Sequence, residues 1–115
     1  MKQNMTWRFT LMQWHVMDNL IKYAMQGLKE NTALCEERLL FMSILGEVQT
    51  TLVVGIQLQR VNPHKQKKFK LTYHQCLVFY RLFWELVLSD RMDIASLEFV
   101  LVHEMCRDIH QKLLT

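Results

Sequence analysis

The sharpest cluster of chemically active side chains lies near the carboxyl end of the chain. His103, Cys106 and His110 are spaced three and four residues apart, so a helix would present all three on one face. Imidazole and thiolate groups are ligand types that zinc prefers. A structural zinc site needs four ligands, however, and the sequence designates no fourth one.

The residues around this cluster do not form the HExxH pattern of a zinc protease, because Arg107 stands where the second histidine would be. The ordinary alternative is that Cys106 is a small apolar residue at the edge of a helix and that both histidines are solvated. We therefore expect no cofactor, and zinc binding at His103, Cys106 and His110 is kept as an alternative hypothesis.

Other catalytic patterns are not found in the sequence. There is no Glu-x-x-His pair of the kind that a di-iron helical bundle uses. The three glycines, Gly27, Gly46 and Gly55, are too isolated to form a phosphate-binding loop. Nucleophilic catalysis needs a nucleophile, a base and an orienting group, and no signature joins the cysteines to the histidines. We expect a protein that is not an enzyme.

A basic segment, residues 64–70, is the most distinctive surface feature that the sequence predicts. It places Phe69 among four lysines, Lys65, Lys67, Lys68 and Lys70. Lysines neutralise nucleic-acid phosphates, and an exposed aromatic ring can stack on a base. The alternative is a solvated connector. The sequence favours the connector, because the formal charge of +3 is concentrated here and the rest of the chain is slightly acidic.

Helices must position these residues, because 3 glycines and 1 proline are too few for a fold made of short strands and turns. Apolar periodicity predicts four helices, at about residues 6–29, 32–60, 73–89 and 93–113. Short connections imply antiparallel neighbours. The predicted fold is therefore all-α, an antiparallel four-helix bundle that forms a single domain over residues 1–115.

Two local patterns refine this prediction. Residues 50–61 are rich in β-branched side chains, so a β-hairpin that pairs 51–61 with 68–73 is the alternative to the second half of the second helix. Thr72-x-x-Gln75 is a capping box, which predicts that the third helix begins directly after the basic segment. Asp18 falls within the apolar stripe of the first helix, and we expect it to pair with Lys22 or His15 because a buried unpaired carboxylate is costly.

The third predicted helix, residues 73–89, is apolar on nearly every side. Three helices with one apolar face each would leave part of it uncovered, at Phe79, Leu82, Phe83 and Leu86. An exposed apolar patch is typical of an interaction surface. We therefore expect an interaction or regulatory protein that binds through this helix to a second copy, as a homodimer, or to another protein. A nucleic-acid-associated accessory protein that uses residues 64–70 is the alternative function.

Cysteine usage and hydropathy bear on localisation. Cys35, Cys76 and Cys106 are odd in number and widely separated, and the first residues lack the apolar core of a signal peptide. Free thiols in a reducing compartment are the simplest explanation. The longest apolar run, residues 77–88, is shorter than the roughly 20 residues that a membrane span needs. We expect a cytoplasmic protein without a membrane segment.

Overall fold

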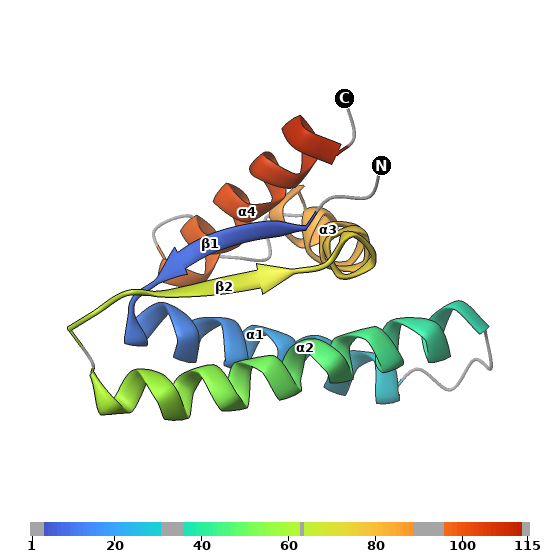
Figure 1. Ribbon diagram of the computed structural model, residues 1–115. Helices are drawn as coiled ribbons and strands as arrows, with labels where there is room; N and C mark the ends of the chain where they lie inside the picture. The colour runs from blue at the N-terminus through green and yellow to red at the C-terminus, as the bar shows by residue number, and fades with distance from the viewer. Residues whose placement is uncertain (1–3, 31–35, 63, 89–95, 114–115) are drawn as a thin grey trace. The chain divides into compact units, whose positions relative to one another are not determined.

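The computed structural model describes residues 4–30, 36–62, 64–88 and 96–113, except for the side chains of residues 85–88. These residues form four helices and a small antiparallel two-stranded sheet (Figure 1). In chain order the elements are β1 (Met5–Phe9), α1 (Leu11–Glu30), α2 (Glu36–Val61), β2 (Lys67–Leu71), α3 (Tyr73–Leu88) and α4 (Leu97–Leu113). The chain is therefore mostly helical, but it is not all-α.

The order strand, helix, helix occurs twice, and the same four-residue cap joins each strand to its helix. The Thr72 amide donates to Gln75 Oε1 at 3.0 Å, and the Gln75 amide donates to Thr72 Oγ1 at 3.4 Å. Thr10 and Gln13 make the equivalent two bonds, at 2.9 and 3.3 Å. Each pair is a capping box that satisfies amides at a helix start. The capping box predicted at Thr72 is confirmed.

The predicted start of the first helix, at residue 6, is wrong. Met5 and Phe9 are buried whereas Thr6 and Arg8 are exposed, which is the two-residue alternation of a strand. The capping box at Thr10 prevents a helix from running through this segment, because Thr10 is the residue before the first helical turn. From Leu11 onward the helix follows the predicted range to within one residue at its end.

The second helix is continuous over Glu36–Val61, so the strand proposed at 51–61 is wrong. Thr50 and Thr51 donate to the carbonyls of Gly46 and Glu47, one turn earlier, and their hydroxyls are thereby satisfied within the helix. The hairpin alternative also predicted a strand at residues 68–73. Lys67–Leu71 is a strand, but its partner is β1 rather than residues 51–61. Residues 32–35, where this helix was predicted to begin, lie outside the described residues.

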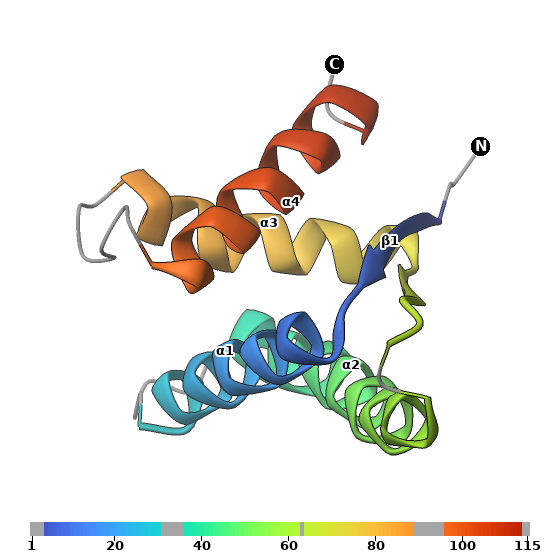
Figure 2. The same cartoon turned by 90° about the vertical axis from the view of Figure 1, so that its left-hand side faces the viewer.

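Contacts divide the chain into two compact units. The unit formed by Thr6–Phe69 contains α1 and α2, which run side by side in opposite directions (Figures 1 and 2). The unit formed by Met1–Met5 and Lys70–Thr115 contains α3 and α4, which also pack on each other. The described helices thus pack as two pairs, and the predicted single four-helix bundle is not confirmed.

Within the first pair, Asp18 is one of the few buried polar residues, at 8% exposure. Its Oδ2 atom lies 2.9 Å from Lys22 Nζ, one helical turn further along α1. Of the two partners expected for Asp18, the structure therefore confirms Lys22. This pair lets a carboxylate occupy the apolar side of α1.

Candidate nucleic-acid interface

One face of the sheet is covered by an aromatic cluster. The rings of Phe9 and Phe69 are stacked with centroids 4.9 Å apart, and Trp14 meets both rings edge-on at 5.7 and 5.4 Å. All three side chains are at most 2% exposed. This cluster fixes which face of the sheet is turned toward the protein interior, because a strand's side chains alternate between its two faces.

The opposite face of the sheet is exposed and basic. Thr6 and Arg8 in β1 alternate with the buried residues Met5 and Phe9. Lys68 and Lys70 in β2 alternate in the same way with Phe69 and Leu71. We call Thr6, Arg8, Lys68 and Lys70 the cationic face.

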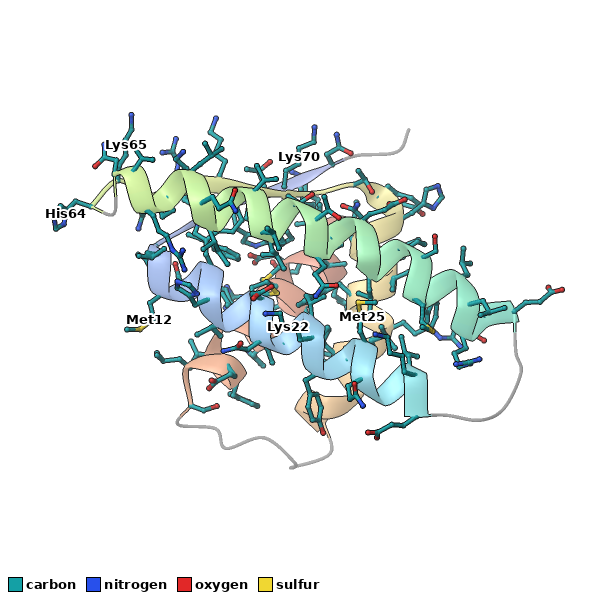
Figure 3. The ribbon with its side chains drawn as sticks, turned by 90° about the horizontal axis from the view of Figure 1, so that it is seen from below. Met12, Lys22, Met25, His64, Lys65 and Lys70 are labelled. Atoms are coloured by element: carbon teal, nitrogen blue, oxygen red, sulfur yellow. The ribbon has the colours of Figure 1, made fainter. Side chains whose placement is uncertain are left out.

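The loop that leads into β2 is tied to the end of α2. Gln59 is fully buried in the last turns of this helix, and its side-chain amide donates to the carbonyl of Lys65. The Lys65 amide in turn donates to the carbonyl of Asn62 at 3.2 Å. His64 and Lys65 are exposed at the carboxyl end of α2 (Figure 3). The buried Gln59 side chain therefore positions the segment that carries the first lysine of the basic run.

Acidic residues are missing from both strands and from the loop. The chain has no aspartate or glutamate before Asp18, and none between Glu47 and Glu85. Arg8 and the five basic residues from Arg60 to Lys70 therefore lie in segments without a carboxylate. Within these two segments, therefore, no residue carries a charge that would offset the basic ones.

The residues predicted to bind nucleic acid in the basic segment differ in their exposure to solvent. Lys65, Lys68 and Lys70 are exposed, whereas Lys67 is half-buried. The nucleic-acid alternative required Phe69 to be free to stack on a base, but Phe69 is fully buried against Phe9 and Trp14, so its ring is not accessible to a ligand.

Arg8 and Thr6 were not identified from the sequence as part of this surface. They had been assigned to a helix, in which they would not alternate with Phe9. The signal that could have found them is Thr10-x-x-Gln13, the same capping pattern that was recognised at Thr72.

The predicted zinc residues do not form a cluster. His103 is exposed and its ring stacks on Phe99, and His110 is exposed with its Nδ1 atom hydrogen-bonded to the Tyr80 hydroxyl at 3.1 Å. Cys106 is fully buried, and this burial raises its pKa to about 12. Zinc binds the thiolate, which this environment disfavours. Among the described residues no three acidic, cysteine or histidine side chains are placed to share a metal ion.

The other described cysteine, Cys76, is equally inaccessible. Burial raises the pKa of Cys76 to about 11, an effect that a hydrogen bond from the backbone of Met5 partly offsets. Its Sγ atom also donates to the Leu71 carbonyl at 3.8 Å. A protonated and buried thiol is a poor nucleophile, so neither of these cysteines has the environment of a catalytic residue.

The residues predicted as an interface on the third helix are mostly buried. Phe79 and Phe83 are at most 2% exposed, with ring centroids 4.6 Å apart, and Leu82 is half-buried. The Leu86 side chain lies outside the described residues. Exposed large apolar side chains of the described residues lie on α1, on α4 and, in the largest number, on α2, at Leu39, Leu40, Val53, Val54, Leu58 and Val61.

Among the described residues, α2 is the one helix long and apolar enough to cross a membrane by length and composition. The sequence argument against a membrane span considered residues 77–88 alone, and α2 removes that argument. The same helix buries Leu45, Val48 and Leu52, but only 28% of its most apolar window is buried. The expectation of no membrane segment stays a prediction.

Comparison of the chain with protein families, with curated proteins and with solved structures finds no match.

Proposed function

We propose that this protein binds nucleic acid, without catalysis, through the cationic face of its sheet. The observation that carries the proposal is the combination of Arg8, Lys68 and Lys70 on the exposed side of two paired strands that contain no carboxylate. Basic side chains in such an arrangement neutralise phosphates and release counterions. Residues 64–70 alone form a small basic surface, and for that reason the sequence did not favour nucleic acid. Arg8 of β1 extends this basic surface onto the other strand of the sheet.

The shape of this surface favours duplex DNA. The major groove of B-DNA admits a two-stranded ribbon, and arginine and lysine donate there to guanine O6 and N7. The major groove of double-stranded RNA is too narrow and deep for side chains to read. Binding to single strands relies on exposed aromatic rings, whereas Phe9 and Phe69 are buried and Trp7 is half-buried.

The test is a salt titration of binding to a labelled DNA duplex, followed by fluorescence anisotropy. The variant Lys68→Ala/Lys70→Ala should bind more weakly, and the slope of log K against log salt should fall by about 1.8, the value for two lost phosphate contacts. The control Lys29→Ala/Lys112→Ala removes two exposed lysines outside the strands, and it should bind as the unaltered protein does. Equal losses in both variants would mean that binding follows net charge and not this surface.

Protein association is the second candidate function, either as a homodimer or with another protein. Four exposed apolar residues in the last turns of α2, Val53, Val54, Leu58 and Val61, support it, because exposed apolar patches mark interaction sites. This surface differs from the predicted one on the third helix. Light scattering of the protein and of Leu58→Glu would test it: the unaltered protein should be a dimer and the variant a monomer. A monomer in both cases would exclude self-association.

A further inference from the structure

The last turns of α2 present an aliphatic surface to solvent. Four large apolar side chains there are between 46% and 85% exposed, and we call them the aliphatic face: Val53, Val54, Leu58 and Val61. The buried residues of the same turns, Leu52, Ile56 and Gln59, lie on the other side of the helix. A contiguous apolar patch that is exposed marks a site of interaction with a protein or a membrane.

The other exposed groups of these turns are almost uncharged. The hydroxyls of Thr50 and Thr51 donate to backbone carbonyls one turn earlier, at 3.1 and 3.3 Å, so neither depends on water. Gln57 has an exposed side-chain amide, and Arg60 is the only charged residue between positions 48 and 61. The solvent side of a surface helix is usually rich in charged residues. This part of α2 is therefore suited to an apolar environment.

α2 as a whole has the length and composition of a membrane helix, but it is packed on one side alone. Of its most apolar 18 residues, only 28% are buried, whereas the central helix of a water-soluble protein is buried on most sides. The buried side packs on α1, where Trp14 lies against Gly55. α2 can keep this contact if it lies along the surface of a bilayer, but it would lose the contact in crossing the bilayer.

Basic residues adjoin the aliphatic face. Arg60 follows Val53 by seven residues and therefore lies on the same side of the helix. Lys65 is exposed just beyond the carboxyl end of α2 (Figure 3). No aspartate or glutamate occurs between Glu47 and Glu85. Anionic lipid headgroups attract such basic residues, and the long side chains of arginine and lysine can reach the headgroups while their stems stay in the apolar layer.

We propose that the aliphatic face of α2 docks on the surface of a bilayer that contains anionic lipids. Its side chains enter the boundary between the headgroups and the acyl chains, and Arg60 and Lys65 contact lipid phosphates. An anionic bilayer offers both an apolar layer and dense negative charge, which matches this combination. The contact needs no membrane-spanning segment. It does not depend on the nucleic-acid proposal, because the residues of the cationic face are not part of it.

The experiment is flotation of the protein with lipid vesicles in a density gradient. Vesicles of equal parts phosphatidylcholine and phosphatidylglycerol are compared with vesicles of phosphatidylcholine alone. The protein should float with the anionic vesicles and much less with the neutral ones. Arg60→Gln and Lys65→Gln should each lower the partition coefficient about fivefold. Alkaline carbonate should release the bound protein, as it releases proteins that do not cross the bilayer.

A matched pair of substitutions tests the aliphatic face itself. Leu58→Glu should lower the partition coefficient at least about tenfold, because it removes a buried apolar contact and brings a negative charge to the headgroups. Leu97→Glu is the control, because Leu97 is similarly exposed on α4 and the variant has the same net charge. It should bind as the unaltered protein does. In addition, the fluorescence of Val61→Trp should move to shorter wavelength on the vesicles, whereas that of Val100→Trp, on α4, should not.

The proposal is overturned if the protein does not float with anionic vesicles at low salt. Equal losses in Leu58→Glu and Leu97→Glu would mean that binding follows net charge and would also contradict it. Protein that resists alkaline carbonate would cross the bilayer and not lie on it. A stable dimer that does not bind the vesicles would assign the aliphatic face to protein association and would equally overturn the proposal.

Discussion

The indole ring of Trp14 lies directly against Gly55, where a Cβ atom would come within 2.5 Å of the ring. A glycine within a helix normally costs stability, and here it is required because α1 and α2 approach each other through this contact. The same indole ring meets Phe9 and Phe69 of the two strands edge-on. The Gly55–Trp14 contact therefore links the packing of the helix pair to the aromatic side of the sheet, and through it to the cationic face.

Gly55→Ala should destabilise the protein by about 1–3 kcal/mol, because an added methyl group in a packed core forces its neighbours to shift. The rigid ring of Trp14 cannot move away as a flexible side chain would. Urea denaturation measures the effect. Gly46→Ala is the matched control in the same helix: a Cβ at Gly46 would meet nothing within 4 Å, so this change should stabilise by up to about 1 kcal/mol. Similar effects of the two substitutions would contradict the packing described for Trp14.

The two capping boxes should contribute similarly to stability. Thr10→Ala and Thr72→Ala each remove a side-chain acceptor at a helix start, and each should cost about 0.5–2 kcal/mol in chemical denaturation. Thr6→Ala provides the control, because Thr6 is exposed in a strand and caps no helix. A loss at Thr72 without a loss at Thr10 would show that the first cap is not formed in solution.

Gln59→Met should loosen the loop before β2 while it preserves the volume of the buried side chain. The carbonyl of Lys65 then loses its donor, but the buried Gln59 Oε1 atom, which has no partner among the described residues, is removed as well, so the free energy of unfolding should fall by only about 1 kcal/mol. If that loop helps to place the basic strand, affinity for duplex DNA should fall as well. Gln57→Met, on the exposed side of the same helix, should change neither quantity. Unchanged stability of Gln59→Met would exclude the described role of Gln59.

Cys76 and Cys106 should react slowly with iodoacetamide at about pH 8 and rapidly once the protein is unfolded. Burial raises the pKa of Cys76 to about 11 and that of Cys106 to about 12, so both stay protonated at this pH in the folded protein. Mass spectrometry of the labelled peptides gives the rate at each cysteine. Rapid labelling of either one in the native protein would contradict its burial.

The same pKa shifts predict a loss of stability in alkali. A group whose pKa is higher in the folded protein than in the unfolded chain keeps its full contribution below the unfolded value, and it loses that contribution as the pH rises toward the folded value. For both thiols the unfolded value is near 9, so the free energy of unfolding should fall from about pH 9 upward. Cys106→Val should fall less steeply over this range. An equally steep fall would assign the alkaline loss to other groups.

Local patterns in the sequence were sufficient wherever one segment determined its own structure. The capping box at Thr72 located the start of α3, and the apolar stripe around Asp18 reduced its expected partners to Lys22 and His15, of which the structure shows Lys22. For α2, β-branched residues left helix and strand open. Packing decided between them, because Leu45, Val48 and Leu52 are buried together on one side of a helix.

The candidate site could be predicted only in part, because it depends on the pairing of distant strands. The lysines were visible in the sequence, but the burial of Phe69 and the participation of Arg8 both follow from the pairing of β1 with β2. The recurrence of Trp7 and Trp14 at a seven-residue interval mimicked a helical stripe and concealed β1. Trp7 lies in a strand and Trp14 in a helix, so their seven-residue interval does not come from one continuous helix. The Thr10 cap is the local pattern that distinguishes this arrangement from a single helix.

The central claim is that Arg8 and Lys68 act on one nucleic-acid-binding surface, although one residue precedes the first helix and the other follows the second. Anisotropy of a labelled DNA duplex with Arg8→Glu, Lys68→Glu and Lys29→Glu tests it most directly, because the three variants have the same net charge. The account predicts that Arg8→Glu and Lys68→Glu weaken binding to a similar extent and much more than Lys29→Glu. Binding that is lost with Lys68→Glu but retained with Arg8→Glu would contradict it, as would the absence of binding to the unaltered protein at low salt.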